Sequence, residues 1–565
     1  MDNEKNGGIV VNDKVNVFVE GFGKISVDKG TTFFELAKKV FGEKYNNYLG
    51  VRIENEIFNL YSTAREGNRI KFIDISDNDG HRIYVRTLSI IYIKACKDLF
   101  PDCKVNIEHS LGKGLYTEIY KGKPINFGEI QQIKDRMNEI IADDIPIERQ
   151  KVTKEEAIRI FEVQNDDDKV RLFKYVNKEK VHVYKLDEHI DVFYGYVAPS
   201  TGYVKAFDLK YYYPGIILQC PNHDSNYLMP EFKESKKLAK IFQEAEDWAD
   251  ILDLGYVGSL NDKITDNSIS EVIRISEALH EKKIAFIADK ICEDKDINII
   301  LIAGPSSSGK TTFAHRLGVQ LKVNGKRPIS ISMDDYFLDR EKTPKNELGE
   351  YDFESVDAID IKLFNEDLIR LLEGEEVELP KYNFVLGKRE ASGVKVRVDR
   401  DHPIIIEGIH GLNSKLTSYI PEKNKFKIYI SALTQLNIDS HNRVPTTDTR
   451  LIRRMVRDYK YRGNDALRTF KLWEPVRRGE EKNIFPFQEE ADIMFNSALS
   501  YELAVLKKYA VPLLETVGRD SEYYSEAKRL LKFLYYFKSV EDESIIPPNS
   551  ILREFIGPIN ATHKN

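Results

Sequence analysis

Gly304-Pro305-Ser306-Ser307-Ser308-Gly309-Lys310-Thr311 stands near the middle of this 565-residue chain and has the Gly-x4-Gly-Lys-Thr pattern of a phosphate loop. The apolar run 297–303 before it predicts a buried strand. Residues 312–322 after it, with Phe313, Leu317 and Leu321 at four-residue spacing, predict a helix. Strand, loop and helix therefore occur in the order that this motif requires.

The spacing has a physical reason, because the backbone N–H groups of such a loop curl around a phosphate at a helix N-terminus. Bulky side chains at Gly304 and Gly309 would obstruct that approach. Lys310 can reach the terminal phosphates, and the Thr311 hydroxyl can ligate Mg²⁺. A plain Gly/Ser-rich turn is the alternative, and the flanking strand and helix argue against it. We therefore predict that ATP and Mg²⁺ bind here. The predicted ATP-binding residues are Gly304, Pro305, Ser306, Ser307, Ser308, Gly309, Lys310, Thr311 and Thr312.

Size and composition indicate an ordinary soluble protein with several domains. A chain of 565 residues is too long for one compact core and predicts about three or four domains. Its formal net charge of −7 gives no overall basic field, so tight nonspecific binding of nucleic acid by the whole chain is not implied. A local basic patch stays open as an alternative.

Cysteine usage and hydropathy bear on the compartment. The cysteines Cys96, Cys103, Cys220 and Cys292 are widely spaced and form no Cys-x-x-Cys pair, which argues against a disulfide framework and a thiolate zinc cluster. The first residues lack the apolar core of a signal peptide, and no segment approaches the run of about 18 apolar residues that a membrane span needs. We expect a cytoplasmic protein with no membrane segment.

The N-terminal segment predicts a small β-rich module with one helix. Residues 15–19 and 24–27 read as a hairpin around a glycine-containing turn. Thr31 or Thr32 supplies a cap for the following helix, and residues 69–73 read as another strand. The order and length of these elements resemble the TGS domain, a ubiquitin-like module of threonyl-tRNA synthetases and some GTPases.

The next stretch, over about residues 80–235, resembles the second additional, or editing, domain of the same synthetases. The motifs that carry the likeness are Asp79-Gly80, residues 86–99, Phe100-Pro101-Asp102-Cys103-Lys104-Val105, Pro199-Ser200-Thr201-Gly202 and Lys205-Ala206-Phe207. That family builds its editing site from a His-x3-His pair and a later Cys-x3-His pair. Here the first pair reads Thr87 and Ile91, and residues 193–198 contain neither Cys nor His. Since Thr and Ile cannot transfer protons or bind zinc as imidazole does, we infer that the shape is kept and the hydrolysis lost.

Two segments between these modules and the phosphate loop read as structural. The acidic run Asp166-Asp167-Asp168 predicts a solvated loop. Residues 236–295 show apolar positions at helical spacing and predict a helical linker.

Two acidic residues follow predicted strands of the C-terminal half. Asp334 comes after the strand 328–333, and Glu407 comes after Ile404-Ile405-Ile406. In a doubly wound sheet the carboxyl ends of the strands face the ligand, so both acids are expected near the nucleotide. Asp334 is the candidate general base and a candidate Mg²⁺ ligand, with a helix cap as the alternative. Glu407 is the second acidic Mg²⁺ ligand, because a buried acid needs a compensating cation.

Four arginines form one stripe of a predicted helix at i, i+3, i+4 and i+7, namely Arg450, Arg453, Arg454 and Arg457. Like charges at this spacing disfavour a helix, so an anionic partner is expected. Transferring phosphates suit this requirement, because guanidinium groups bind phosphate oxygens in pairs. A solvated basic face, or one that contacts RNA, remains the alternative.

The motif order over about residues 296–520 resembles the uridine kinase and phosphoribulokinase family. The motifs are the phosphate loop, Met333-Asp334-Asp335-Tyr336-Phe337, Tyr351-Asp352-Phe353 with Asp357-Ala358, Pro380-Lys381-Tyr382-Asn383-Phe384, Ile406-Glu407-Gly408-Ile409 and Thr447-Asp448-Thr449-Arg450-Leu451. The resemblance implies catalytic roles for Asp334, Lys310, Arg454 and Arg457. It implies substrate contacts for Asp357, Tyr382 and Arg454, and metal contacts for Thr311, Asp334 and Glu407.

The chain departs from this family at the acceptor side. Uridine kinases carry a base-reading histidine where this chain has Gly387, and Asn383 replaces an aspartate of the same motif. Asn464 replaces a second lid arginine. Because losing a base-reading donor can cost orders of magnitude in discrimination, phosphorylation chemistry carries over more safely than uridine itself.

The resulting prediction is a multidomain α/β protein in which a β-grasp module and an α+β editing-like domain precede a P-loop kinase domain with a parallel sheet. The predicted segments are 12–75 (TGS-like), 79–235 (editing-like), 236–295 (helical linker), 296–545 (P-loop uridine kinase-like) and 546–565 (C-terminal tail). The expected activity is ATP-dependent phosphorylation of a sugar hydroxyl, most simply the 5′-hydroxyl of a nucleoside. The alternative is an RNA- or tRNA-associated P-loop ATPase or adaptor, in which the N-terminal half contacts the RNA. A homo-oligomer stays open.

Overall fold

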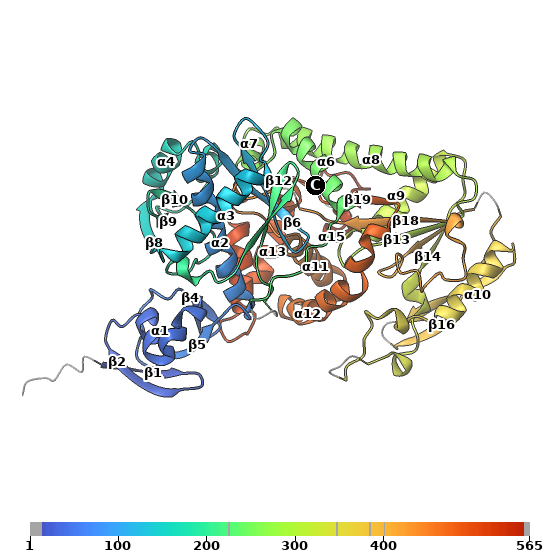
Figure 1. Ribbon diagram of the computed structural model, residues 1–565. Helices are drawn as coiled ribbons and strands as arrows, with labels where there is room; N and C mark the ends of the chain where they lie inside the picture. The colour runs from blue at the N-terminus through green and yellow to red at the C-terminus, as the bar shows by residue number, and fades with distance from the viewer. Residues whose placement is uncertain are drawn as a thin grey trace, which may run out of the picture. The chain divides into compact units, whose positions relative to one another are not determined.

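The computed structural model describes residues 14–223, 227–345, 349–383, 386–399, 402–434 and 436–558. Residues 12–13 of the predicted first domain, Phe384 of the Pro380 motif and residues 559–565 of the predicted tail lie outside these ranges. The chain divides into two compact units (Figure 1). Unit 1 takes its described residues from Met1–Glu234, Ile438–Arg443 and Val517–Phe533, and unit 2 takes the rest. Within the described ranges, every helix is too short or too polar to cross a lipid bilayer.

Unit 1 begins with a mixed five-stranded sheet of the β-grasp type, in the order β2-β1-β5-β3-β4. The strands are β1 (Lys14–Val19), β2 (Gly23–Asp28), β3 (Gly50–Ile53), β4 (Glu56–Phe58) and β5 (Arg69–Ile73). The predicted hairpin is confirmed, because β1 and β2 pair antiparallel. Helix α1 (Phe33–Phe41) begins after Thr32, whose hydroxyl accepts from Glu35 N–H while the Glu35 carboxylate accepts from Thr32 N–H. This capping box fixes the helix start.

The remainder of unit 1 contains two antiparallel sheets, in the orders β11-β12-β7-β6 and β10-β9-β8. The strands are β6 (Lys104–Leu111), β7 (Gly114–Tyr120), β8 (Glu148–Thr153), β9 (Lys180–Leu186), β10 (His189–Asp191), β11 (Asp208–Tyr212) and β12 (Gly215–Gln219). The helices are α2 (Asn78–Leu99), α3 (Phe127–Ala142), α4 (Lys154–Val163) and α5 (Asp167–Phe173).

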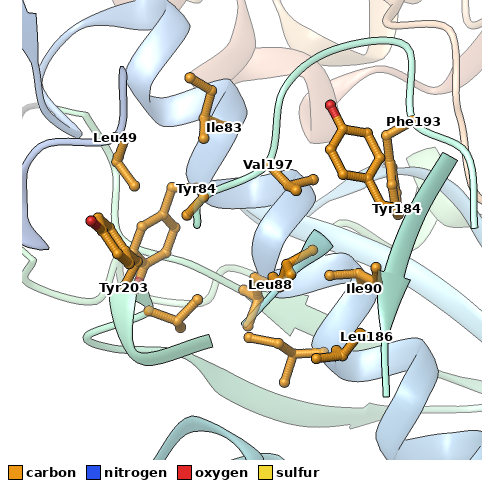
Figure 2. Close-up of a cluster of buried hydrophobic side chains, with 14 of the residues drawn as sticks. Leu49, Ile83, Tyr84, Leu88, Ile90, Tyr184, Leu186, Phe193, Val197 and Tyr203 are labelled. Atoms are coloured by element: carbon orange, nitrogen blue, oxygen red, sulfur yellow. The ribbon is translucent and has the colours of Figure 1, made fainter. Parts of the chain in front are cut away.

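One hydrophobic core runs through both modules of unit 1. Figure 2 shows Leu49 of the first module close to Tyr84 and Tyr203, while Leu88 and Ile90 of α2 face Leu186 of β9. The two stretches aligned with the synthetase editing site meet here, because Ala198 N–H donates to Thr87 Oγ1 (2.8 Å). Ile91, Phe193 and Val197 of these stretches are buried and apolar, whereas Tyr194 and Tyr196 are partly exposed.

A cluster of buried charges holds the segment Ile438–Arg443 within unit 1. Lys169 Nζ lies 3.1 Å from Asp191 Oδ1, and both side chains are fully buried. His441 Nδ1 lies 2.6 Å from Asp191 Oδ2 and 2.8 Å from Lys169 Nζ. Burial alone would raise the pKa of Asp191, but His441 and Lys169 hold it well below its usual range. The ionised carboxylate therefore connects α5, β10 and the 438–443 segment.

The solvated loop predicted at residues 166–168 is only partly correct. Asp167 is exposed, but it starts helix α5. Asp166 pairs with buried Lys169 (3.4 Å), and Asp168 accepts from Ser440 N–H (2.7 Å). The run therefore helps to neutralise a buried lysine and to anchor a distant segment, which charge density alone did not indicate.

Asp191→Ala should destabilise unit 1 by about 3–5 kcal/mol, because it leaves Lys169 buried without its closest carboxylate. Hydrogen exchange of β9 peptides in increasing urea would measure the loss. Asp167→Ala is the matched control, since the Asp167–Lys104 pair (3.5 Å) is largely solvent-exposed, and it should change little. Equal losses in the two variants would contradict the role given to the buried cluster.

Unit 2 is built on a five-stranded parallel sheet in the order β14-β17-β13-β18-β19. The strands are β13 (Ile299–Ala303), β14 (Ile329–Ser332), β17 (Ile404–Glu407), β18 (Lys425–Ser431) and β19 (Ile493–Asn496). The central strand β13 is buried throughout, as its continuous apolar run predicts. This confirms the predicted parallel-sheet fold of the C-terminal half.

Helices cover this sheet, and the predicted helical linker forms the first three of them. They are α6 (Lys236–Leu252), α7 (Val257–Thr265), α8 (Ile269–Glu293), α9 (Lys310–Val323), α10 (Ile361–Leu372), α11 (Thr446–Arg462), α12 (Ala466–Asn483), α13 (Glu502–Glu515) and α15 (Arg553–Ile556). Helix α14 (Tyr524–Leu534) lies almost wholly in the segment Val517–Phe533, which belongs to unit 1. Helix α9 packs against β13 and β17 and also against α8 (Figure 1), to which Arg316–Glu281 joins it (2.7 Å). A hairpin of β15 (Val377–Asn383) and β16 (Lys388–Val396) completes the unit.

Three of the parallel strands end in polar segments at one edge of the sheet. β13 leads into residues 304–309, β14 into the short 3₁₀ turn Met333–Tyr336, and β17 ends at Glu407. Because the carboxyl ends of parallel strands meet at the same edge, these segments lie together. This edge is where the candidate site is built.

Candidate active site

The glycine-rich loop connects β13 to α9 with little room to spare. Gly309 has a left-handed backbone (φ +85°), and Gly304 approaches the chain so closely that a Cβ would lie 2.0 Å from Ile430 O. Both positions therefore require glycine. Lys310 Nζ donates to Gly304 O (3.0 Å) and Pro305 O (3.2 Å), so its ammonium group is folded over the loop. The N–H groups that begin α9 have no partner within the helix and are suited to an anion.

Three titratable groups converge on this loop. Burial lowers the pKa of Lys310, while Glu407, Glu554 and Asp334 oppose that shift. Burial raises the pKa of Asp334 and of Glu407, and Lys310 opposes the shift in each. Two carboxyls and one lysine whose pKa values are shifted in this way form the kind of perturbed cluster found at functional sites.

The predicted metal ligands offer a suitable donor set for Mg²⁺. Thr311 Oγ1 donates to Glu407 Oε1 (3.1 Å), and Asp334 acts electrostatically on Glu407. Mg²⁺ prefers oxygen ligands and is often held by one or two carboxylates plus substrate phosphates. Among the residues that the structure describes, no group of three His, Cys, Asp or Glu side chains could hold a metal alone. Phosphate oxygens would therefore complete the shell around Thr311, Glu407 and Asp334.

The arginine stripe lies on α11, and its four members have different surroundings. Arg450 and Arg453 are buried and paired with buried Glu480 and Glu502. The anionic partners of these two arginines are thus side chains of the same unit. Arg450 Nε also donates to Ser306 O (3.0 Å), which braces the loop.

The other two arginines of the stripe are those predicted to be catalytic. Arg454 Nη1 donates to Ser306 Oγ (2.8 Å), so this guanidinium touches the loop. Arg457 Nη2 pairs with Asp458 Oδ1 (2.8 Å) on its own helix. Arg462, which sequence reasoning did not single out, acts electrostatically on Asp334 and opposes the rise of its pKa.

The predicted acceptor-side residues lie around the same 3₁₀ turn that carries Asp334. Tyr382 N–H donates to Asp335 Oδ1 (3.2 Å), and its ring packs on Phe337 (5.7 Å between centroids). Asp357 is exposed and pairs with Lys415. Its segment is joined to the turn by Leu338 N–H, which donates to Ala358 O (2.8 Å).

Arg340 packs against Gly387, the residue that stands where the family pattern has a histidine. Gly387 has φ +66°, and a Cβ there would lie 2.8 Å from Arg340 Nε. A side chain at residue 387 would therefore require Arg340 to move. Arg340 also lowers the pKa of Tyr382, although burial raises that pKa overall. A guanidinium thus packs against the residue that stands where the family pattern has a histidine.

Two carboxylates that sequence reasoning missed contact the loop. Glu480 Oε1 accepts from Ser306 N–H (2.9 Å). Glu554 Oε2 accepts from Thr312 Oγ1 (2.8 Å) and N–H (3.3 Å). Glu554 belongs to the predicted tail, yet its neighbours Ile551, Leu552, Phe555 and Ile556 are buried. The apolar pairs Ile551-Leu552 and Phe555-Ile556, which flank two charged residues, were the available signal for a packed segment.

Glu554→Gln should tighten ADP binding by about twofold to fivefold, because a carboxylate would no longer compete with phosphate for the N–H groups at the start of α9. Titration calorimetry with ADP and Mg²⁺ would measure the change. Glu515→Gln, at an exposed position of α13, is the control and should leave the affinity unchanged. Unchanged or weaker binding in Glu554→Gln would show that this carboxylate does not compete.

The loop, Asp334, Glu407 and the arginine helix all lie within one recognisable domain. Residues 299–503 match the model of the Phosphoribulokinase / Uridine kinase family. This match confirms the predicted resemblance of the C-terminal half, which contains a P-loop kinase domain. Members of this domain class use ATP and Mg²⁺. Glu554 lies beyond the matched residues.

The N-terminal half is similar to threonine–tRNA ligases, which confirms the predicted resemblance of this half to these synthetases. The ligase of Caldanaerobacter subterraneus subsp. tengcongensis is 31% identical over 187 residues, which cover 33% of this chain and 29% of the ligase. The ligase of Clostridium kluyveri is 27% identical over 196 residues, which cover 34% of this chain and 31% of the ligase. The chain therefore spans less than a third of the length of these relatives.

A solved structure described as a possible uridine kinase from Bacillus stearothermophilus is 22% identical. The match covers 38% of this chain and 98% of that chain, with a TM-score of 0.24. A likeness at this TM-score adds nothing further about the fold.

Proposed function

We propose that the kinase domain transfers the γ-phosphoryl group of ATP to a sugar hydroxyl, with the 5′-hydroxyl of a nucleoside as the leading acceptor. The observation that carries the proposal is the convergence of Lys310, Asp334 and Glu407 at the carboxyl edge of the sheet, beside the phosphate loop. A cytoplasmic location and the residue roles predicted from the motifs belong to the same proposal.

In this mechanism the loop binds and orients the phosphates. The N–H groups at the start of α9 and the Lys310 ammonium offset charge on the transferred group, and Arg454 adds a guanidinium from α11. Thr311, Glu407 and Asp334 would hold Mg²⁺, which would neutralise charge on the phosphates when bound. Ionised Asp334 accepts the hydroxyl proton as the acceptor oxygen bonds to the γ-phosphorus and the bond to the β-phosphate oxygen breaks, which releases ADP.

The acceptor is the least constrained part of this proposal. The replacement of the base-reading histidine by Gly387, with Arg340 packed against it, supports an acceptor site that differs from that of uridine kinases. A sugar hydroxyl remains the proposed reacting group, with Asp334 as the proposed acceptor of its proton. Screening a panel of nucleosides together with ribulose 5-phosphate for ATP-dependent products would test the proposal. The proposal would be contradicted if none of these acceptors gave a phosphorylated product.

The second candidate function is an RNA-associated P-loop ATPase or adaptor. The observation in its favour is the similarity of the N-terminal half to threonine–tRNA ligases. Filter binding to tRNA over a salt series separates the two functions. Micromolar, strongly salt-dependent binding without sugar phosphorylation would favour the adaptor, because phosphate contacts release counterions.

Lys310→Ala should abolish ATP turnover, because it removes the ammonium that reaches the phosphates. Asp334→Asn should keep ATP binding but lower the rate of transfer by about 10²–10⁴-fold, since the base is lost while the shape is kept. Steady-state kinetics with titration calorimetry would separate binding from transfer. An Asp334→Asn enzyme at full rate would remove Asp334 as the base.

The rate should follow a bell-shaped pH profile. Its acid limb should lie at higher pH, and its basic limb at lower pH, than the ordinary pKa values of aspartate and lysine would give. Transfer requires ionised Asp334, so the rate rises as pH passes the pKa of this carboxyl, which burial raises above its usual value. Transfer also requires protonated Lys310, whose pKa burial lowers, so the rate falls at a lower pH than for an ordinary lysine. Measuring kcat/KM from pH 4 to 10 checks both limbs. Any residual activity of Asp334→Asn should lack the acid limb assigned to Asp334.

A further inference from the structure

We propose that unit 1 binds the phosphate group of a phosphorylated ligand at a site formed by Arg86, Arg149 and Lys532 around Tyr196. Arg86 lies on α2, Arg149 on β8 and Lys532 on α14, so three elements contribute one cation each. All three residues and Tyr196 belong to the same compact unit. The site is separate from the phosphate loop and does not depend on the kinase activity.

Arg86 is held against the chain segment that carries Tyr196. Its Nη1 donates to Tyr196 O (3.4 Å). A Cβ on Gly195 would lie 2.2 Å from the central carbon of the same guanidinium, so Gly195 makes room for it. This close packing fixes the guanidinium in place before any ligand arrives.

The other two cations lie over the Tyr196 ring. The guanidinium of Arg149 is 5.3 Å from the ring centroid, and Lys532 Nζ is 5.6 Å from it. Arg149 also stands opposite Tyr184 in the β8–β9 register, and Tyr184 Oη donates to Gly195 O (2.8 Å). Both Arg149 and Lys532 are exposed, so an external anion can reach them. The aromatic ring thus gathers two cations at an accessible surface.

These three cations lack the carboxylates that neutralise their neighbours. Arg82 and Arg529 both pair with Glu526, and Lys528 pairs with Glu56. Within the described part of the chain, by contrast, no carboxylate lies within 4.0 Å of the charged groups of Arg86, Arg149 or Lys532. Like charges held together without an anion are unfavourable, so the cluster would be stabilised by an anionic ligand.

The titration of the surrounding groups agrees with this geometry. Desolvation of the ammonium, together with the nearby cations Lys528, Arg86, Arg149 and Lys178, lowers the pKa of Lys532 to about 8. Desolvation of the imidazole and the cations Arg149, Lys151, Lys178 and Lys532 likewise lower the pKa of His182 to about 4. An anion bound among these groups would raise both values again.

Phosphate is the ligand chemistry that suits this arrangement. Two guanidinium groups can each offer paired N–H donors to phosphate oxygens, and an ammonium adds a compact point charge. The phosphate could belong to a small metabolite or nucleotide, or to the backbone of RNA. Both sources present the same oxygens to the cluster, so the experiment must separate them.

The test is protection of Lys532 from acylation in the full chain carrying Lys310→Ala, which weakens binding at the phosphate loop. An amine-reactive reagent at pH 7 is followed by peptide mass spectrometry, with paired Lys528 as the internal reference. Pyrophosphate is the first probe, and a 12-nucleotide single-stranded RNA is the second. Bound phosphate should slow Lys532 labelling by about tenfold, because each pKa unit changes the reactive fraction by nearly that factor.

Protection by pyrophosphate supports a small phosphorylated ligand, and protection by RNA alone supports a backbone phosphate. Arg149→Gln should remove either effect, whereas Arg136→Gln, whose arginine pairs with Asp98 and Glu139, should preserve it. Arg149 is exposed, so this variant should fold even if substitution of the packed Arg86 is not tolerated. Equal labelling of Lys532 with and without both probes would overturn the proposal. Since Lys310→Ala is already expected to be inactive, the readout is independent of kinase activity.

Discussion

The geometry of the phosphate loop depends on the buried carboxylate of Glu480. It accepts from Ser306 N–H and pairs with Arg450, which in turn donates to Ser306 O. The backbone N–H and C=O of one loop residue are thus tied to α12 and α11. A buried carboxylate persists only where cations and N–H groups compensate it, so the ion pair and the loop conformation support one another. Arg453, which pairs with Glu502, repeats the arginine part of this arrangement by donating to Ser307 O (3.4 Å).

This bracing divides the arginine helix into two working parts. Arg450 and Arg453 are almost fully buried and contact the backbone of the loop. Arg454 and Arg457 are less deeply buried. Arg454 reaches the Ser306 hydroxyl, whereas Arg457 is paired along its own helix. The role of each arginine on α11 therefore depends on its position along the helix more than on the spacing that the four arginines share. Some guanidinium groups of one stripe can thus stabilise the loop backbone while others remain available to a ligand.

The sequence predicted those features whose causes are local. The glycine loop, the apolar strands and the Thr32 cap depend on neighbouring residues, and the structure contains each of them. Contacts between distant residues were not accessible in this way. Glu480 lies 174 positions from Ser306, and Glu554 lies 242 positions from Thr312. Likewise, the spacing of Arg450 and Arg453 revealed a stripe but not that its partners were buried glutamates, because periodicity does not say what packs against a helix.

The threading of the chain has a practical consequence. Because unit 1 takes Ile438–Arg443 and Val517–Phe533 from the C-terminal half, no single cut in the polypeptide separates the two units cleanly. A fragment ending near residue 234 would expose Asp191 and Lys169 without His441. Neither unit can therefore be removed or replaced as one continuous segment of the chain.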